Sequence, residues 1–416
     1  MILILHRGEL KPLYQLLEQF ERNEEVILLL AKEKITEVCL PYLQKIKSMV
    51  HGVFPIENYD NSSRVEYEVY CLSRKYKITA LFAIAEFDLY RAERIKKWLN
   101  LSYIEESVLE LFRNKMSMKN YFTQQGIKTS RYSAVKSVLD IYDFVEKYGF
   151  PVVVKQQEGG GGVGTRILKS MQDIAQFARS DFRVNGYTEP NLMIESYVQG
   201  KLYHIDGVCY NQKILYLSCG AYIHGMIEDF DAGLSLGSVL IPNHLEIYQK
   251  LYQAQQNIIQ AVQLSGAFSF HTEYFIDENG QMILCETACR TGGALINQTN
   301  AKIRNMDINL WLLNTLYQHS PYEVNSKNHH TSGGWVIYGL GKRTARVLDI
   351  AQMCNLPYVL DYQPKVAIGQ TIYPAVSNIQ GICGMVFSAE NESQALLNYQ
   401  NICDWVENNF KIDFVS

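Results

Sequence analysis

A run of glycines that follows a short apolar strand constrains this chain more than any other feature of its sequence. Residues 151–166 read PVVVKQQEGGGGVGTR, so Lys155 ends the apolar stretch and five of the six positions 159–164 are glycine. Glycine has no Cβ, which lets backbone N–H groups wrap closely around an anion, and a lysine adds a mobile positive charge beside them. The segment therefore predicts a loop that binds a polyphosphate.

The order of residues in this loop separates it from other phosphate-binding loops. Its lysine precedes the glycines and no Gly-Lys-Ser or Gly-Lys-Thr follows, which disfavours a P-loop NTPase. The spacing G-x-G-x-x-G occurs within it, but without the strand-turn-helix context of a dinucleotide-binding fold. A flexible linker is the structural alternative for a glycine-rich run. The apolar strand in front of the loop disfavours that alternative.

A second segment carries the other half of the predicted site. Residues 266–293 read GAFSFHTEYFIDENGQMILCETACRTGG, which predicts two strands joined by an Asp-Glu-Asn-Gly turn. Because side chains alternate along a strand, His271 and Glu273 share one face, while Glu286 closes the second strand and Arg290 follows it. Two carboxylates on adjacent strands suit a hard cation, and an arginine suits a phosphoryl group or a carboxylate. The segment predicts a magnesium-nucleotide site, with a solvated carboxylate as the alternative for Glu273 taken alone.

Taken together, these segments resemble the ATP-grasp superfamily, whose members hold ATP between two α+β lobes and activate a carboxylate as an acyl phosphate. Two further segments are similar to elements of that family. One is Arg-Asn-Lys-Met at 113–116, which carries Lys115. The other is MIESYVQG at 193–200, similar to the interlobe hinge that presents backbone groups and a glutamate to adenine. The resemblance covers residues 110–320 approximately.

This resemblance implies a role for each matched residue. ATP would be held by Lys115, Lys155, Glu158, Gly159, Gly160, Gly161, Gly162, Val163, Gly164, Glu195, Ser196, Tyr197 and Val198. Glu273 and Glu286 would hold Mg²⁺, with Mn²⁺ as the second candidate. Lys155 and Arg290 are the implied catalytic residues. The substrate would contact His271, Arg290, Gly292, Gly293 and Ala294, of which His271 and Ala294 are candidates for the wall of the pocket.

Within the superfamily, the chain is most similar to the L-amino-acid ligases and their carboxylate-amine relatives, in its His-x-Glu and its Glu-Thr-Ala-Cys-Arg-Thr-Gly-Gly segment. Two positions depart from the family pattern. The signature Glu-x-Asn-x-Arg has a metal-binding asparagine where this chain has Ala288, which implies that the protein supplies fewer ligands to the metal. An acidic residue often follows the hinge to hold the ribose, but Leu202 stands there in this chain. The ribose contacts are therefore left open.

The chain divides into four predicted blocks. Residues 1–112 alternate apolar runs with helical patterns, as in a Rossmann-like parallel α/β domain, but without a dinucleotide fingerprint. Residues 113–198 form the small ATP-grasp lobe and residues 199–318 the large one. Residues 319–416 are interpreted as a C-terminal α+β extension that covers the active site or forms an oligomer interface. The predicted fold class is thus α/β and α+β in several lobes.

Two finer expectations concern the large lobe and the extension. In the extension, strand-like runs lie at 334–338, 366–368 and 384–387. In the large lobe, His204 and Asp206 share one face of a predicted strand. That face either meets the substrate or is solvated, and solvation is the more common situation for a polar strand face.

Composition agrees with a cytoplasmic enzyme of several lobes. The 416 residues exceed what one core normally supports, and 47% of them are hydrophobic. A net charge of −4 gives no electrostatic case for nucleic acid or an anionic membrane. No stretch approaches the ~18 apolar residues of a membrane span, and the apolar start has no basic segment before it, so it reads as a strand and not as a signal peptide. The nine cysteines contain no Cys-x-x-Cys pair, which favours free thiols.

Three functions fit these observations. The first is an ATP-dependent ligase that activates an amino-acid carboxylate and couples it to a second amino acid, giving ADP and phosphate. The second is a ligase that activates the carboxylate in the same way but transfers the acyl group to a carrier-protein thiol or an amino sugar. The third is a non-catalytic nucleotide-binding module. Biotin-dependent carboxylation is disfavoured because the chain has no Met-Lys-Met carrier segment. The expected partners are small-molecule amino acids, with no nucleic acid or membrane, and a homodimer is a further expectation.

Overall fold

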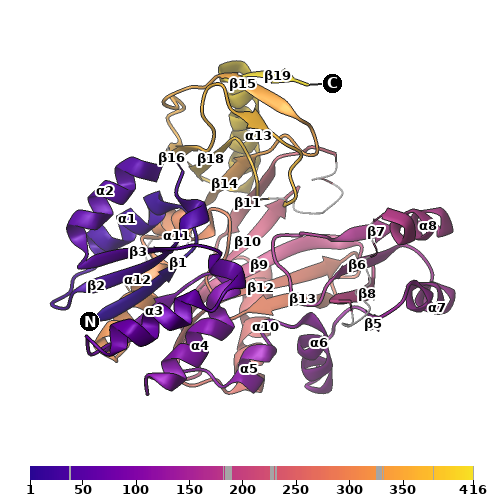
Figure 1. The fold of residues 1–416 in the computed structure, drawn as a ribbon. Helices are drawn as coiled ribbons and strands as arrows, with labels where there is room; N and C mark the ends of the chain where they lie inside the picture. Colours follow the sequence, from indigo (N-terminus) through magenta and orange to yellow (C-terminus); the bar gives the residue numbers. More distant parts are fainter. Residues whose placement is uncertain are drawn as a thin grey trace.

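Four sheets with flanking helices form the described part of the molecule (Figure 1). The computed structural model describes residues 1–36, 39–180, 182, 190–224, 229, 232–324, 330, 332–377 and 379–415. The N-terminal domain lies on one side of the long central strands, the small lobe projects on the other side, and the C-terminal part lies at the top of the view in Figure 1. All nine cysteines are free. None of the helices in the described ranges is long and apolar enough to cross a membrane.

The N-terminal domain is a parallel α/β sandwich, as predicted. Its sheet has the order β3-β2-β1-β4, and all three neighbouring pairs are parallel. The central strands are buried along their whole length because helices cover both faces, α1 and α2 on one and α3 and α4 on the other. The elements are β1 (Ile2–His6), α1 (Leu10–Gln19), β2 (Val26–Ala31), α2 (Leu40–Met49), β3 (Gly52–Ile56), α3 (Arg64–Ser73), β4 (Ala80–Ala83), α4 (Leu89–Trp98) and α5 (Glu106–Glu110).

The small lobe is an antiparallel sheet backed by two helices. Its strand order is β5-β8-β6-β7, and the glycine-rich segment connects β6 to β7. Apolar residues of α7, α8 and the strands pack into one core. The elements are α6 (Lys115–Gln124), β5 (Tyr132–Val135), α7 (Val138–Tyr148), β6 (Val152–Gln156), β7 (Arg166–Leu168), α8 (Met171–Ser180) and β8 (Leu192–Ser196).

The largest sheet has eight antiparallel strands in the order β13-β12-β9-β10-β11-β14-β18-β16. Helices α10 and α13 cover one face, and α11 and α12 cover part of the other, against which the N-terminal domain also packs. The remainder of that second face carries the polar residues described below. The elements are β9 (Gly200–Tyr210), β10 (Lys213–Ile223), β11 (Leu236–Ile241), α10 (Glu246–Val262), β12 (Ala267–Asp277), β13 (Met282–Ala288), α11 (Ile296–Arg304) and α12 (Ile308–Gln318).

The C-terminal strands extend this same sheet. The predicted runs 334–338 and 384–387 lie in β14 and β18, and a three-stranded sheet β17-β15-β19 lies beside them. The expectation of a strand at 366–368 is wrong, because this short run lies in the connection between β16 and β17, where Gly369 adopts a positive φ of 84°. The division into four blocks stays a prediction. The elements are β14 (Ser332–Tyr338), β15 (Ala345–Asp349), β16 (Val359–Pro364), β17 (Thr371–Ile372), β18 (Cys383–Ala389), α13 (Glu392–Asn409) and β19 (Lys411–Phe414).

Candidate active site

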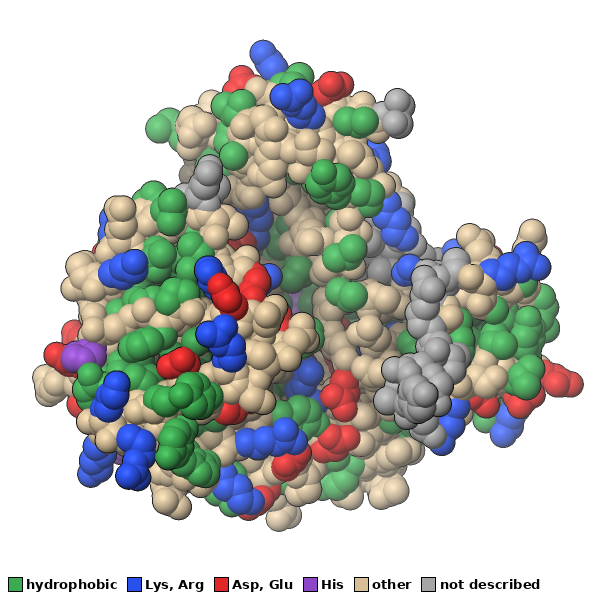
Figure 2. All heavy atoms as spheres, in the orientation of Figure 1, with side chains coloured by type: hydrophobic (Ala, Val, Ile, Leu, Met, Phe, Trp, Pro, Cys, Tyr) green, Lys and Arg blue, Asp and Glu red, His purple; other side chains and the backbone are tan. Residues whose placement is uncertain are grey.

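A cavity of about 1330 Å³ lies where the lobes meet. It is bordered by the glycine-rich loop, the end of β8, the β12–β13 hairpin, the N-terminal domain and the C-terminal segment 370–382. Figure 2 shows the molecular surface hollowed between the N-terminal domain and the rest of the molecule. Every residue assigned to the site from the sequence borders this cavity except Glu158 and Gly164. The chain thus brings residues from distant segments into one cleft.

Two lysines, Lys155 and Lys119, share one buried carboxylate, that of Glu195. Lys155, on β6, lies 2.5 Å from Glu195 Oε1, and Lys119 lies 3.0 Å from Glu195 Oε2. Lys119 also donates to Ser130 Oγ, which in turn donates to Glu195. Burial alone would raise the pKa of Glu195, but the two ammonium groups lower it to about 2. Burial likewise opposes the charge of Lys155, yet Glu195 holds the pKa of that lysine above its usual value.

This arrangement gives Glu195, in the predicted hinge segment, a different partner from the one that the resemblance implies. The carboxylate of Glu195 faces the two lysines, whereas the resemblance had assigned it to adenine. Ser196, Tyr197 and Val198 border the cleft beyond it, as does Leu202. Lys119 was missed in the sequence, although its spacing of four residues from Lys115 places both on one face of α6. That spacing was the signal available to find it.

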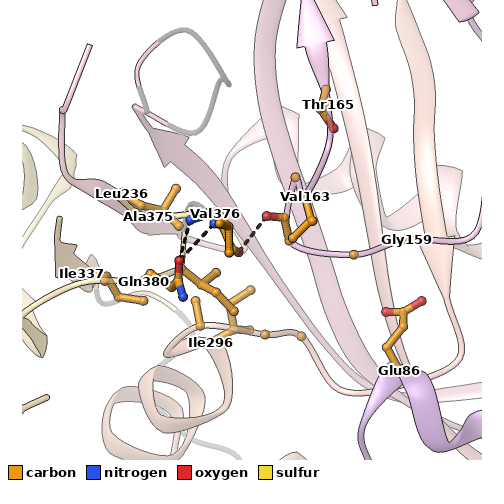
Figure 3. Close-up of a pocket in the computed structure, with 18 of the residues that line it drawn as sticks. Glu86, Gly159, Val163, Thr165, Leu236, Ile296, Ile337, Ala375, Val376 and Gln380 are labelled. Atoms are coloured by element: carbon orange, nitrogen blue, oxygen red, sulfur yellow. Dashed lines mark hydrogen bonds between the residues drawn. The ribbon is translucent and has the colours of Figure 1, made fainter. Parts of the chain in front are cut away.

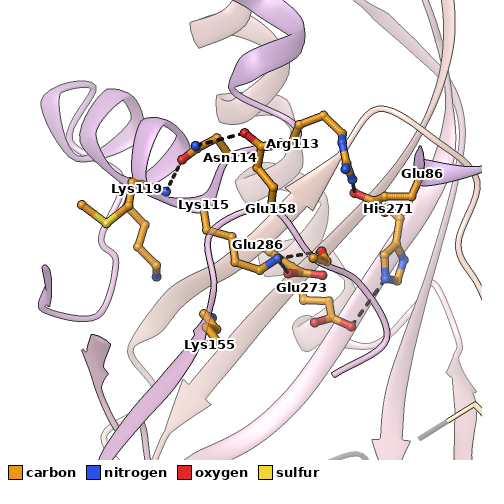
Figure 4. A network of polar contacts seen from close by, with 12 residues as sticks. Glu86, Arg113, Asn114, Lys115, Lys119, Lys155, Glu158, His271, Glu273 and Glu286 are labelled. Atoms are coloured by element: carbon orange, nitrogen blue, oxygen red, sulfur yellow. Dashed lines mark hydrogen bonds and ion pairs between the residues drawn. The ribbon is translucent and has the colours of Figure 1, made fainter. Parts of the chain in front are cut away.

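Lys115 connects the glycine-rich loop to the hairpin (Figure 4). It begins α6, whose N-terminus is capped by the side chain of Asn114. Its Nζ lies 3.0 Å from Glu286 Oε2 and donates to the carbonyl of Gly159 at 3.1 Å. Asn114 also donates to Glu158, so that glutamate supports the loop from outside the cleft. One lysine thus contacts both the predicted phosphate loop and a predicted metal ligand.

The two predicted metal ligands lie directly opposite each other. Glu273 on β12 pairs in register with Glu286 on β13, and both border the cleft. Burial would raise the pKa of Glu286, but Lys115 and Lys155 lower it to about 2, so this carboxylate is ionised at neutral pH. Glu273 accepts a hydrogen bond from Tyr222 at 2.8 Å. Two carboxylates at one point of a cleft form a donor set suited to Mg²⁺.

A glutamate of the N-terminal domain organises two arginines. Glu86, which follows β4, pairs with both Arg290 and Arg113. Arg290 also donates through Nη1 to the carbonyl of Thr291 at 2.9 Å. Glu86 was not among the residues predicted from the sequence. Its position just after a strand of a parallel sheet was the available signal, because ligands of such sheets bind beyond the carboxyl ends of the strands.

His271 belongs to a buried hydrogen-bonded cluster. Its Nδ1 lies 2.8 Å from Asp206 Oδ1, and His204 Nδ1 lies 2.6 Å from Asp206 Oδ2. Burial would lower the pKa of His271, but Asp206 raises it to about 10. His204 and Asp206 are at most 1% exposed and do not border the cleft, so the solvated face and the direct substrate contact are both wrong. Gly292 is required here, because a Cβ would lie 2.3 Å from Asp206 Oδ1.

The glycine-rich loop contacts the C-terminal part of the chain. Gly161, Gly162 and Gly164 adopt φ values of 63°, 69° and 72°, which residues with a Cβ rarely adopt. The carbonyl of Gly161 accepts a hydrogen bond from Ser377 Oγ at 2.8 Å. The loop therefore lies over the cleft between β6 and the segment that carries Ser377.

Comparison with known proteins finds ligases and an ATP-grasp domain. Residues 113–265 match the family Phosphoribosylglycinamide synthetase, ATP-grasp (A) domain. The chain is 26% identical over 285 residues to an L-arginine-specific L-amino acid ligase of Bacillus subtilis, covering 68% of each chain. It is 26% identical over 257 residues to a D-alanine–D-alanine ligase of Trichlorobacter lovleyi, covering 57% of this chain and 76% of the relative. The crystal structure of an L-amino acid ligase from Bacillus licheniformis superposes with a TM-score of 0.76 at 14% identity, covering 100% of this chain and 98% of that one.

Residues 113–265 thus match an ATP-grasp domain, and the whole chain has the fold of the ATP-grasp superfamily. It is an ATP-dependent ligase of the class that forms C–N bonds.

The metal shell provides a first testable prediction. Ala288 is 4% exposed and lies opposite His271, two residues beyond Glu286 on β13. The change Ala288→Asn places an amide oxygen near the two carboxylates, so we expect the free Mg²⁺ concentration for half-maximal activity to fall roughly 10-fold, the lower end of the usual effect of residues around a metal. Magnesium titration at saturating ATP measures it. Equal half-saturation in both proteins would show that residue 288 does not face the metal.

The pKa of Glu195 provides a second prediction. A carboxyl whose pKa falls from 4.5 to about 2 on folding contributes stability above pH 4.5, on the order of 3 kcal/mol, and this stability is lost as the pH falls toward 2. Glu195→Gln should therefore be less stable at neutral pH and should flatten the dependence of the unfolding free energy on pH below 4.5. Urea unfolding at several pH values measures it. The exposed Glu246, paired with Lys250 on α10, offers the control Glu246→Gln, and an equal flattening there would contradict the prediction.

Proposed function

We propose that this enzyme activates the carboxylate of one amino acid as an acyl phosphate and joins it to the amino group of a second, giving a dipeptide, ADP and phosphate. The observation that carries the proposal is the convergence of Glu273, Glu286, Lys115, Lys155 and Arg290 on one cleft. The similarity to an L-amino acid ligase over two thirds of both chains supports it.

The chemistry requires two anions to meet, because the substrate carboxylate must attack the γ-phosphate. Mg²⁺, with Mn²⁺ as second candidate, would be held by Glu273 and Glu286 and would supply positive charge to the phosphates when bound. Lys115 and Lys155 lie beside the glycine-rich loop and would offset the remaining negative charge. Because Lys119 also neutralises Glu195, Lys155 can turn toward a phosphate without leaving that carboxylate unpaired.

The second step is the attack of the amine on the acyl phosphate. The negative charge that develops on the tetrahedral intermediate would be stabilised by Arg290, next to Gly292 and Gly293. An acyl phosphate hydrolyses readily, so water must be excluded while it exists. The glycine-rich loop, connected to Ser377, would form the cover over the cleft.

Phosphate release from ATP across a matrix of amino acids, offered singly and in pairs, tests the proposal. Release that requires pairs, together with a dipeptide product, supports it. Release with a single amino acid and a carrier-protein thiol or an amino sugar would instead favour acyl transfer to that acceptor. No release under any of these conditions would favour a nucleotide-binding module. Glu286→Gln is the matched control, because it keeps the shape of the site but removes a charge needed by the metal.

A further inference from the structure

One wall of the cleft is apolar. Leu236 on β11, Trp335 and Ile337 on β14, and Ile296 at the start of α11 border the cavity, and each is at most 6% exposed. Figure 3 shows Leu236, Ile296 and Ile337 on the same side of the pocket, next to Ala375 and Val376. These side chains pack into a core of their own behind the wall, so its shape is held firmly. Leu236, Ile296, Trp335 and Ile337 together form the apolar wall of the cleft.

The apolar wall adjoins the proposed reacting centre. The hydroxyl of Tyr222 donates to Glu273, and the ring of Tyr222 meets that of Trp335 edge to face, with centroids 6.3 Å apart. Ile296 begins the helix that follows Gly292 and Gly293 by a few residues. One tyrosine therefore separates the wall from a predicted metal ligand. A carboxylate that reacts at the metal would carry its side chain within reach of the wall.

The acidic side chains that border the cleft are already paired with other described residues. Each glutamate that borders it already has a partner within the described part of the chain: Glu9 with Lys365, Glu86 with Arg290, Glu195 with Lys155, Glu286 with Lys115, and Glu273 with Tyr222. None of the four residues of the wall is charged, so the wall itself offers no ion pair to a guanidinium or ammonium side chain. A charged side chain placed there would lose its hydration without compensation.

The wall also contains one buried donor. The indole Nε1 of Trp335 has no hydrogen-bond partner among the described residues. Buried donors are almost always paired in folded proteins, and leaving one unpaired costs free energy.

We propose that the apolar wall binds the side chain of the amino acid whose carboxylate is activated, and that this substrate is an amino acid with a medium or large apolar side chain, of the leucine, methionine or phenylalanine class. This inference rests on the proposed function. It separates the chain from its relative described as arginine-specific, because the wall matches hydrocarbon and offers nothing to a guanidinium group.

The wild-type enzyme provides the first test. With one fixed amine acceptor, kcat/KM should be at least ~10-fold higher for leucine, methionine or phenylalanine as the activated acid than for glutamine, glutamate or arginine. The order of residues in the dipeptide, read by mass-spectrometric fragmentation, identifies which amino acid was activated. A preference for glutamine or arginine as the activated acid would overturn the inference and leave the ligase function standing.

Two truncations on one strand provide the second test. Ile337 borders the cleft, whereas Val336, also 1% exposed, points from β14 toward α13 on the other face of the sheet. Ile337→Ala should lower the ratio of kcat/KM for leucine to that for alanine as activated acid by ~10-fold, because it removes contacts that only the larger side chain makes. Val336→Ala is the matched control and should keep the ratio. An unchanged ratio in Ile337→Ala, or an equal change in both variants, would overturn the inference.

A direct binding experiment tests the proposed substrate class separately from the proposed ligase function. Equilibrium dialysis of radiolabelled leucine with the wild-type enzyme, Mg²⁺ and a non-hydrolysable ATP analogue needs no turnover. Leucine binding that methionine displaces and arginine does not would support the substrate class even if no dipeptide forms, in which case the proposed function alone would fail. Binding of arginine in preference to leucine would overturn the substrate class whatever the outcome of the turnover assay.

Discussion

Lys155→Ala is expected to lower kcat for ADP formation at least ~10²-fold, the scale for removing a preorganised charge-stabilising group, while the protein stays folded. Lys155 borders the cleft at the end of β6, beside the glycine-rich loop, where the charge of bound ATP has to be offset. The fold should survive because Lys119 still pairs with Glu195 after the substitution, so the buried carboxylate keeps a cation. ATP turnover measured beside circular dichroism separates loss of function from loss of structure.

Lys201 supplies the control for this prediction. It is an exposed lysine on β9 whose partner Glu392 lies 3.5 Å away, and it does not border the cleft. Lys201→Ala should turn over ATP at the native rate, because an exposed ion pair contributes little. Native turnover by Lys155→Ala would remove the phosphate site from this end of β6.

The hairpin that carries the predicted metal ligands could be predicted from sequence because its determinants are local. The alternation of apolar and polar residues and the Asp-Glu-Asn-Gly turn predict two strands within 266–293, and the structure pairs β12 with β13 around Gly280 at a φ of 73°. The turn fixes the register, and the register places Glu273 opposite Glu286. The parallel N-terminal sheet is confirmed for a similar reason, since continuous apolar runs alternate there with helical patterns.

Interactions between distant segments could not be predicted in this way. His204 and Asp206 alternate with apolar neighbours, which usually indicates a solvated face, yet both are buried. Their remaining hydrogen bonds are made by distant residues, because Asp206 pairs with His271, 65 residues further along, and His204 pairs with Ser238. Glu86 joins Arg290 across 204 residues. No periodicity within one segment indicates such a pair.

In the C-terminal part, the sequence likewise does not indicate which strands pair with one another. The runs in β14 and β18 are recognisable as strands, but nothing in them indicates that they continue the sheet of β9 to β13. This continuation places Trp335 and Ile337 in the wall of the cleft. Two of the four residues that the proposal makes responsible for substrate choice, Trp335 and Ile337, therefore come from a segment that the resemblance does not cover.

Arg290 provides the second prediction of large effect. If its guanidinium group stabilises the carboxylate, the acyl phosphate and the tetrahedral intermediate, Arg290→Lys should lose product formation almost as completely as Arg290→Ala, at least ~10²-fold in each case. A lysine cannot replace it, because a bidentate planar fork fits these oxygens and a point charge does not. The structure already shows that fork divided between two partners, with Nε on Glu86 and Nη1 on the carbonyl of Thr291.

Affinity for ATP should change little in both variants, because the nucleotide would be held by the hinge, Lys115, Lys155 and the glycine-rich loop. Arg113→Lys is the control, since Arg113 shares Glu86 with Arg290 but does not border the main cleft. Its product formation should stay close to native, which would assign the loss in the Arg290 variants to the reacting centre and not to a disturbed Glu86. Nucleotide binding by fluorescence titration and dipeptide formation are measured on all three variants. Near-native ligation by Arg290→Lys would mean that this arginine contributes only general positive charge, and an equal loss in Arg113→Lys would move the role to the pairing with Glu86.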